Sequence, residues 1–108
     1  MIKLREICAI LGRPHTMEIV ANLRCAEKFL KQITEETGVP YTTVQARIAD
    51  MEAAGMVITW REPRRGDGKA VKKVRLKPFK QELSPTAIQV WLDETEADPG
   101  HKGGHRNR

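Results

Sequence analysis

The sequence has few of the residues that mark a secreted, membrane-spanning or metal-binding protein. Its 108 residues include two cysteines, Cys8 and Cys25, too few for a disulfide framework and without the paired spacing of a structural zinc site. The longest apolar run, residues 7–11, is far shorter than the roughly 20 residues that span a bilayer. No glycine-rich phosphate loop, paired carboxylates in an apolar setting or nucleophile beside a histidine is present. These absences predict a cytoplasmic protein that is not an enzyme and needs no metal or cofactor.

Positive charge is concentrated in one segment. The net charge is +5, yet residues 1–60 carry seven basic and seven acidic side chains. Residues 61–80 carry nine basic and two acidic side chains, a net charge of +7, while residues 81–98 carry five acids and no base. A segment with a net charge of +7 beside a balanced body is typical of a surface that binds a polyanion, although a solvated basic surface is the alternative.

Hydrophobic spacing predicts four helices, a hairpin and a last helix. Helical periodicity covers residues 2–11, a second segment that reopens at Arg13-Pro14, and then residues 27–37 and 42–54. Gly38 is expected to cap the third helix in the left-handed conformation. Residues 56–61 and 70–77 alternate as strands around a turn rich in Pro, Gly and Arg, and a helix capped by Ser84 follows. The inward-facing residues of the first four helices are Leu4, Ile7, Cys8, Leu11, Ile19, Val20, Leu23, Phe29, Leu30, Ile33, Val44, Ile48 and Met51.

The third and fourth helices, joined by a short turn, have the order of a helix-turn-helix, whose second helix can enter the major groove of DNA. The following hairpin adds a two-stranded basic wing. The fold class is therefore α+β, mainly α: a winged helix-turn-helix with a C-terminal helix. The candidate DNA-binding residues are Tyr41, Thr42, Thr43, Gln45 and Arg47 at the start of the second helix, and Arg64, Arg65 and Lys69 at the wing tip.

Two side chains of the second helix suit base recognition. The Gln45 amide can pair with adenine through two hydrogen bonds, and Arg47 can pair with guanine or a phosphate. A local alternative exists, because Thr42 and Gln45 also have the spacing of a capping box, in which Gln45 folds back onto its own helix.

The motifs resemble those of the ArsR-type winged helix-turn-helix regulators over about 70 of the 108 residues. The stretch LGRPHTMEIVANL is similar to the opening helix of that family, and VPYTTVQARIADMEAAGMV is similar to its recognition helix and the turn after it. The resemblance implies a homodimer that binds double-stranded DNA, with the first and last helices in the dimer contact.

The resemblance does not extend to the metal-ligating residues of the family, so metal sensing is not expected. The segments that hold the metal ligands of the family correspond to FLKQITEETG, which has no Cys or His, and to TAIQVWLDETEA, which has no His. Pro40 also replaces the usual capping serine, which predicts a later start for the recognition helix.

The termini supply the expected dimer contacts. The candidate residues are Leu4, Cys8, Ile88, Trp91 and Leu92, although the last helix could instead cover the core of its own subunit. Buried thiols are expected for Cys8 and Cys25, with a redox sensor or a disulfide as alternatives. Residues 1–97 are expected to form the domain, and residues 98–108 a disordered basic tail.

These observations predict a sequence-specific DNA-binding transcription regulator. Two rival functions remain open at this stage: a winged-helix module that binds other proteins of the transcription or replication machinery, and a thiol- or ligand-gated sensor with the same fold.

Overall fold

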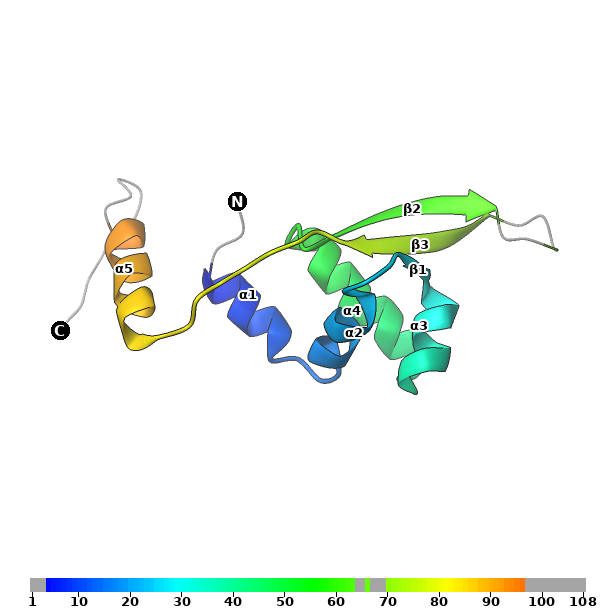
Figure 1. The fold of residues 1–108 in the computed structure, drawn as a ribbon, viewed down its shortest axis with the longest axis horizontal. Coiled ribbons are helices and arrows are strands. Elements are labelled where there is room, and N and C mark those ends of the chain that lie inside the picture. The colour runs from blue at the N-terminus through cyan, green and yellow to red at the C-terminus, as the bar shows by residue number, and fades with distance from the viewer. Residues whose placement is uncertain (1–3, 64–65, 67–69, 97–108) are drawn as a thin grey trace.

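The computed structural model describes residues 4–63, 66 and 70–96. Helices and strands follow in the expected order, with one additional short strand (Figure 1). The elements are α1 (Leu4–Leu11), α2 (Thr16–Leu23), β1 (Lys28–Phe29), α3 (Leu30–Thr37), α4 (Tyr41–Ala53), β2 (Val57–Pro63), β3 (Ala70–Leu76) and α5 (Pro85–Glu96). The mainly helical α+β prediction is therefore correct.

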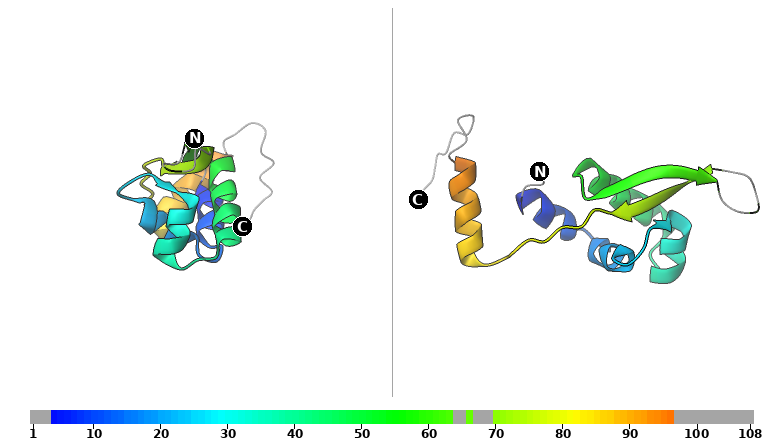
Figure 2. Two further views of the ribbon diagram at one scale, coloured as in Figure 1. Left: turned by 90° about the vertical axis from the view of Figure 1, so that its right-hand side faces the viewer. Right: turned by 45° about the horizontal axis from the view of Figure 1, so that its top comes forward.

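The sheet has three antiparallel strands in the order β1-β3-β2. Val57 pairs with Leu76 at one end of the β2–β3 ladder, and Pro63 pairs with Ala70 at the other. The strand β1 is new: residues 28 and 29 were expected to open a helix but pair with Val74 and Lys73. A two-residue strand has no periodicity of its own, and only its pairing with β3 defines it. Helices α2, α3 and α4 lie on the same side of the sheet, and no helix of the described residues covers its other face (Figure 1, Figure 2).

The core lies between these helices and the inner face of the sheet. Ile19, Ile33, Val44, Met51 and Val74 are completely buried. The core cluster consists of Ile19, Leu23, Leu30, Ile33, Val39, Val44, Ile48, Met51, Met56, Val57 and Val74. The helical stripes read from the sequence account for the apolar faces of α2, α3 and α4, which pack together because each helix has one such face.

The turn between α3 and α4 has the predicted geometry. Gly38 has a φ of 79°, in the left-handed region that favours glycine, and its N–H donates to the carbonyl of Thr34 at 2.9 Å. The next residue, Val39, is buried in the core, and its N–H donates to Thr37 Oγ1 at 3.1 Å. The buried Val39 thus anchors the turn, and with it the start of α4, to the core.

Two helix starts differ from the predictions. The α2 helix begins at Thr16 and not at Pro14, since His15 before it has a φ of 72° and interrupts the helical backbone. The α4 helix begins at Tyr41, so Pro40 does not delay it; the Pro40 carbonyl accepts the first helical hydrogen bond, from Val44 N–H at 2.9 Å. No side chain caps α4, and the expected alternative of a Thr42–Gln45 capping box is wrong.

The C-terminal helix α5 stands apart from the core. The extended segment 77–84 leads to it, and α5 lies beyond α1 at one end of the molecule (Figure 1). The predicted cap is confirmed, because Ala87 N–H donates to Ser84 Oγ at 3.0 Å. A cation–π contact joins α5 to α1, with the Arg5 guanidinium 5.3 Å from the centre of the Trp91 ring. None of the helices within the described ranges has the length and apolar character that crossing a bilayer requires.

The expectation of buried thiols is wrong. Cys8 and Cys25 are both exposed and free. Leu4 and Ile7 form the buried side of the short helix α1, and Cys8 lies beside this stripe on the solvent side. Cys25 follows the end of α2, in the link to β1, where no core element covers it.

Candidate nucleic-acid interface

The start of α4 and the two strands of the wing meet in one small pocket. Tyr41 and Gln45 of α4 line it together with Arg61 of β2 and Lys72 of β3, and its volume is about 190 Å³. Leu30 and Val71 complete the lining, so no carboxylate belongs to this set. Tyr41 and Gln45 are exposed on the helix, opposite the buried Val44 and Ile48. The arrangement places hydrogen-bonding groups of the helix beside two cations.

The register of the hairpin explains how the two cations come together. Arg61 and Lys72 are cross-strand partners, and their side chains share the sheet face that carries the buried Val74. The wing is longer than the core requires, so beyond Val74 this face has cations in place of apolar residues. Both residues were counted in the basic segment of the sequence but were not selected as DNA-binding candidates, because their position beside α4 depends on strand register.

Arg47 lies in a different setting from Gln45. Its side chain is 17% exposed, and one guanidinium nitrogen lies 3.4 Å from the carboxylate of Asp50. Arg13, in the link between α1 and α2, approaches the same carboxylate at 3.7 Å. Arg47 thus belongs to a cluster that joins α4 to this link, and the structure does not bring it to the pocket formed by Gln45, Arg61 and Lys72.

The remaining predicted DNA-binding residues divide into two groups. Thr42 is exposed and Thr43 is half-buried in the first turn of α4, next to Tyr41. Arg64, Arg65 and Lys69 lie outside the described residues, as does the predicted tail, residues 98–108. Within the described residues, the wing contributes to the candidate interface through Arg61 and Lys72 of its two strands.

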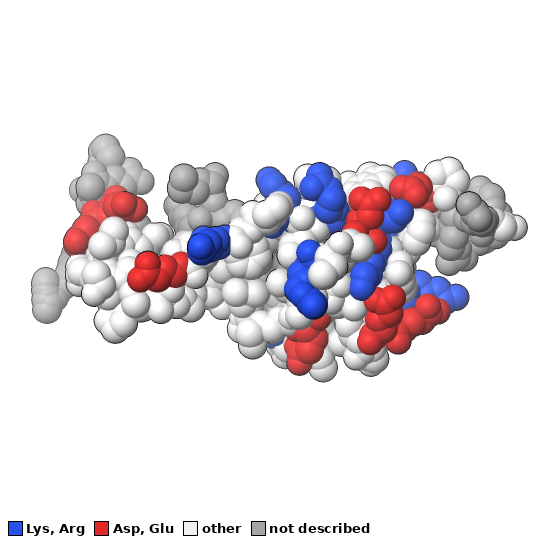
Figure 3. All heavy atoms as spheres, viewed as in Figure 1, with Lys and Arg blue, Asp and Glu red and all other residues white. Residues whose placement is uncertain are grey.

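One cation on the outer face of the sheet, Lys73, is already paired. Lys73 Nζ lies 3.2 Å from Glu62 and 3.5 Å from Glu27, and it stacks over the Phe29 ring at 4.9 Å. The hydrogen bond to Glu62 is the main cause of a raised Lys73 pKa, and the Trp60 indole and Lys73 lower the pKa of Glu62 by donating to it. Figure 3 shows acidic and basic side chains interspersed over the face it displays. This pairing neutralises Lys73, so this residue has little charge to offer a polyanion.

Glu36 joins three elements below the sheet. Its carboxylate accepts hydrogen bonds from Lys28 of β1 at 2.5 Å, Asn22 of α2 at 3.1 Å and Gln32 of α3 at 3.2 Å. The Lys28 bond, followed by those from Asn22 and Gln32, lowers the pKa of Glu36 from 4.5 to about 2. This network holds the first helix of the helix-turn-helix against the body.

We expect acid to weaken the fold partly through Glu36. In the unfolded chain this carboxylate takes up a proton near its ordinary pKa, whereas in the folded chain it does so only near a pKa of about 2. The ionised Glu36 therefore stabilises the fold above about pH 5, and this stabilisation is lost as the pH falls toward 2. Thermal unfolding should show that Glu36→Gln lowers Tm at pH 7 and that the difference from wild type narrows steadily in acid.

The exposed Glu35, on the same helix, supplies the control for this prediction. Glu35→Gln removes the same charge and should leave the slope of Tm against pH between 5 and 2.5 as in wild type. A constant difference between Glu36→Gln and wild type over this range would contradict the assignment. High salt should shrink the effect, because the carboxylate is exposed and its ion pair is screened.

Metal-ligating residues do not converge in the part of the chain that the structure describes, where no group of three or more His, Cys, Asp or Glu could hold an ion.

The expected dimer residues differ in exposure. Leu4 is buried within its own subunit, Cys8 is exposed, Ile88 is 44% exposed, and Trp91 and Leu92 are half-buried. Exposed apolar side chains at this end of the molecule therefore lie on α5, where Val90 is also 50% exposed, and on Leu83 just before it.

Comparison with known proteins identifies the fold. No protein-family model and no curated protein matches the chain. The crystal structure of fragment 1–100 of a possible transcriptional regulatory protein from Mycobacterium bovis matches 88% of this chain and 94% of its own, with 20% identity and a TM-score of 0.53. The solution structure of a homodimeric winged helix-turn-helix DNA-binding domain from the same organism, a possible ArsR-family transcriptional regulator, matches 97% and 87%, with 19% identity and a TM-score of 0.55. The chain has the winged helix-turn-helix fold.

Proposed function

We propose that this winged helix-turn-helix protein is a sequence-specific regulator of transcription that binds double-stranded DNA. One observation carries the proposal: the first turns of α4 and the cations on the two strands of the wing face a common pocket without a carboxylate. Helix α4 would enter the major groove, and the wing would lie along the neighbouring backbone. Such a role places the protein in the cytoplasm and requires no catalytic chemistry.

The proposed roles follow from side-chain chemistry. Gln45 is exposed and can pair with adenine through two hydrogen bonds, whereas Arg61 and Lys72 supply charge to phosphates. Tyr41 and Thr42 offer hydroxyl groups to the backbone at the start of the helix. Base reading is assigned to Gln45 and not to Arg47, because Arg47 is mostly buried and already paired with Asp50.

A homodimer is part of the proposal. The solution structure of the M. bovis domain is described as homodimeric. In this chain, the exposed Ile88 and Val90 on α5 have no apolar cover within the described part of the subunit. A second copy could bury them, together with Trp91 and Leu92 and the neighbouring side of α1. Two-fold symmetry would then present two α4 helices to successive major grooves.

Fluorescence anisotropy with a random duplex, repeated over a range of salt concentrations, tests the proposal. If each subunit neutralises about 4 phosphates, log K against log salt should have a slope near −7 for the dimer, since each phosphate contributes roughly −0.9. A slope shallower than about −2, or no binding at low salt, would instead favour the rival function of a protein-binding module.

We expect Gln45→Ala to reduce sequence preference. Selection of bound sequences from random DNA first identifies the preferred site. The variant should then lose about 1–3 kcal/mol on that site, as expected for a two-bond contact to one base, and little on random DNA. The matched control is Gln81→Ala in the segment between β3 and α5, which should bind both duplexes as wild type does. An equal loss of Gln45→Ala on both duplexes would reject base reading by this residue.

A further inference from the structure

A second, larger pocket adjoins the candidate DNA interface. It has a volume of about 410 Å³ and lies where β1 ends, α3 begins and α4 starts. The two-residue strand β1 leaves β3 uncovered beyond Lys73, and the pocket occupies this gap beside Val71. Phe29, Leu30, Tyr41 and Val71 give it an apolar lining. Its volume is within the range of small-molecule sites, roughly 300–1,000 Å³.

The lining has few polar groups that a ligand can reach. Thr34 is one of the lining residues, but its Oγ1 is buried away from solvent and does not face the pocket. The charged side chains of Lys31, Lys72 and Glu35 therefore supply the polar contacts that the pocket offers to a ligand.

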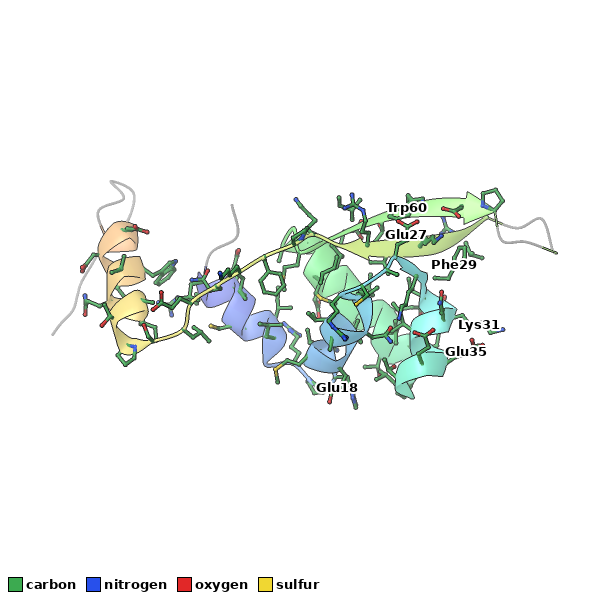
Figure 4. All side chains as sticks on the ribbon, viewed as in Figure 1. Glu18, Glu27, Phe29, Lys31, Glu35 and Trp60 are labelled. Carbon is green, nitrogen blue, oxygen red and sulfur yellow. The ribbon has the colours of Figure 1, made fainter. Side chains whose placement is uncertain are left out.

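The charges around the pocket favour an anion. Lys31 and Lys72 contribute two cations and Glu35 one carboxylate. Lys31 and Glu35 project from α3 on the same end of the molecule as Phe29 (Figure 4). A ligand with one carboxylate could pair with a lysine, while an aromatic ring would pack against Phe29 and Tyr41.

We propose that this pocket binds a small aromatic carboxylate and that its occupancy weakens DNA binding. The regulatory half of this inference rests on the proposed function. Tyr41 and Lys72 line both pockets, so a bound carboxylate would engage a cation proposed to hold a phosphate and would place a negative charge beside the DNA backbone. By thermodynamic linkage, bound DNA must weaken the binding of the carboxylate ligand by the same factor.

Titration of the free protein, followed by amide NMR, tests the pocket without DNA. Three probes share an indole ring and differ in charge: indole-3-acetate, its neutral amide and the cationic tryptamine. Indole-3-acetate should bind with a Kd of about 0.1–1 mM, as its size allows, and shift the amides of Leu30, Thr34 and Val71. The amide should bind more weakly and tryptamine weakest.

Three variants separate the apolar lining from the charged side chains. Phe29→Leu removes an aromatic ring from the lining and should raise the Kd of indole-3-acetate about threefold to tenfold. Lys31→Gln should raise the Kd of the carboxylate but not that of the amide. Lys80→Gln removes a cation outside the lining and should change neither. Equal binding of the three probes, or an unchanged Kd in Phe29→Leu, would overturn the site.

Anisotropy with DNA decides the regulatory half. Saturating indole-3-acetate should raise the Kd of wild-type protein for DNA at least about fivefold at constant ionic strength, and Phe29→Leu should require proportionally more probe. If the carboxylate binds and the Kd for DNA does not change, the coupling is rejected and the proposed function stands. If the protein binds no DNA at low salt, both the proposed function and the coupling are rejected, whereas the NMR titration decides the pocket independently.

Discussion

Replacing Arg61 and Lys72 together with alanine should weaken DNA binding by at least about 100-fold near 0.1 M salt. The double variant removes two cations from each subunit, and four phosphate contacts in a dimer account for a slope of about 3 to 4 in log K against log salt. Both residues line the pocket beside α4 and are proposed to contact phosphates. Because phosphate contacts carry no sequence information, the loss should be the same on the preferred site and on random DNA. Anisotropy at several salt concentrations measures the affinity and the slope together.

The control for this variant has the same change in charge. Arg75 is exposed on the opposite face of β3, one position beyond the buried Val74, and Lys80 is exposed in the segment that leads to α5. Arg75→Ala with Lys80→Ala should keep most of the affinity. If both double variants lose affinity equally, net charge and not the position of the wing cations controls binding.

Ile48→Ala should have the largest effect on stability. Ile48 is 1% exposed and belongs to the face of α4 that packs on the core. Removing its side chain leaves a cavity, for which the expected loss in the free energy of unfolding is about 2–5 kcal/mol. A loss of this size should lower Tm by more than about 10 °C in a domain of this length. Thermal and urea unfolding followed by circular dichroism measure it.

Ile58→Ala is the matched control. Ile58 is 38% exposed on the outer face of the sheet, ten residues along the chain from Ile48. Its removal should cost under about 1 kcal/mol, since exposed strand positions contribute little packing. Similar losses at the two positions would mean that α4 is not seated on the core as described.

Local chemistry made most of the fold predictable. The helical stripes of α2, α3 and α4, the left-handed Gly38 and the Ser84 cap all depend on residues within a turn of one another. Features that depend on distant partners were missed or misplaced. The strand β1 exists only because Lys28 and Phe29 pair with β3, and the exposure of Cys8 depends on which side of a two-turn helix meets the body.

The sequence predicted the kind of interface but not all of the residues that form it. The sequence indicated a polar helix start and a basic wing, and the structure brings Tyr41 and Gln45 to one pocket with two cations. The pairing of Arg47 with Asp50 was not predicted. Helical periodicity allows Arg47 either to pair with Asp50, three residues further along, or to point into solvent, and it does not decide between the two. Arg61 and Lys72 required the register of the hairpin. The resemblance to ArsR-type regulators agrees with the solved neighbours in fold.

The isolation of α5 has a consequence for the design and evolution of this chain. Among the described residues, no member of the core cluster lies beyond Val74, so the extended segment 77–84 separates the packing of the body from α5. If α5 forms the proposed dimer contact, substitutions in it would change the choice of partner subunit without repacking the core. Replacing α5 with a helix of different specificity would then produce new subunit pairs on the same helix-turn-helix body.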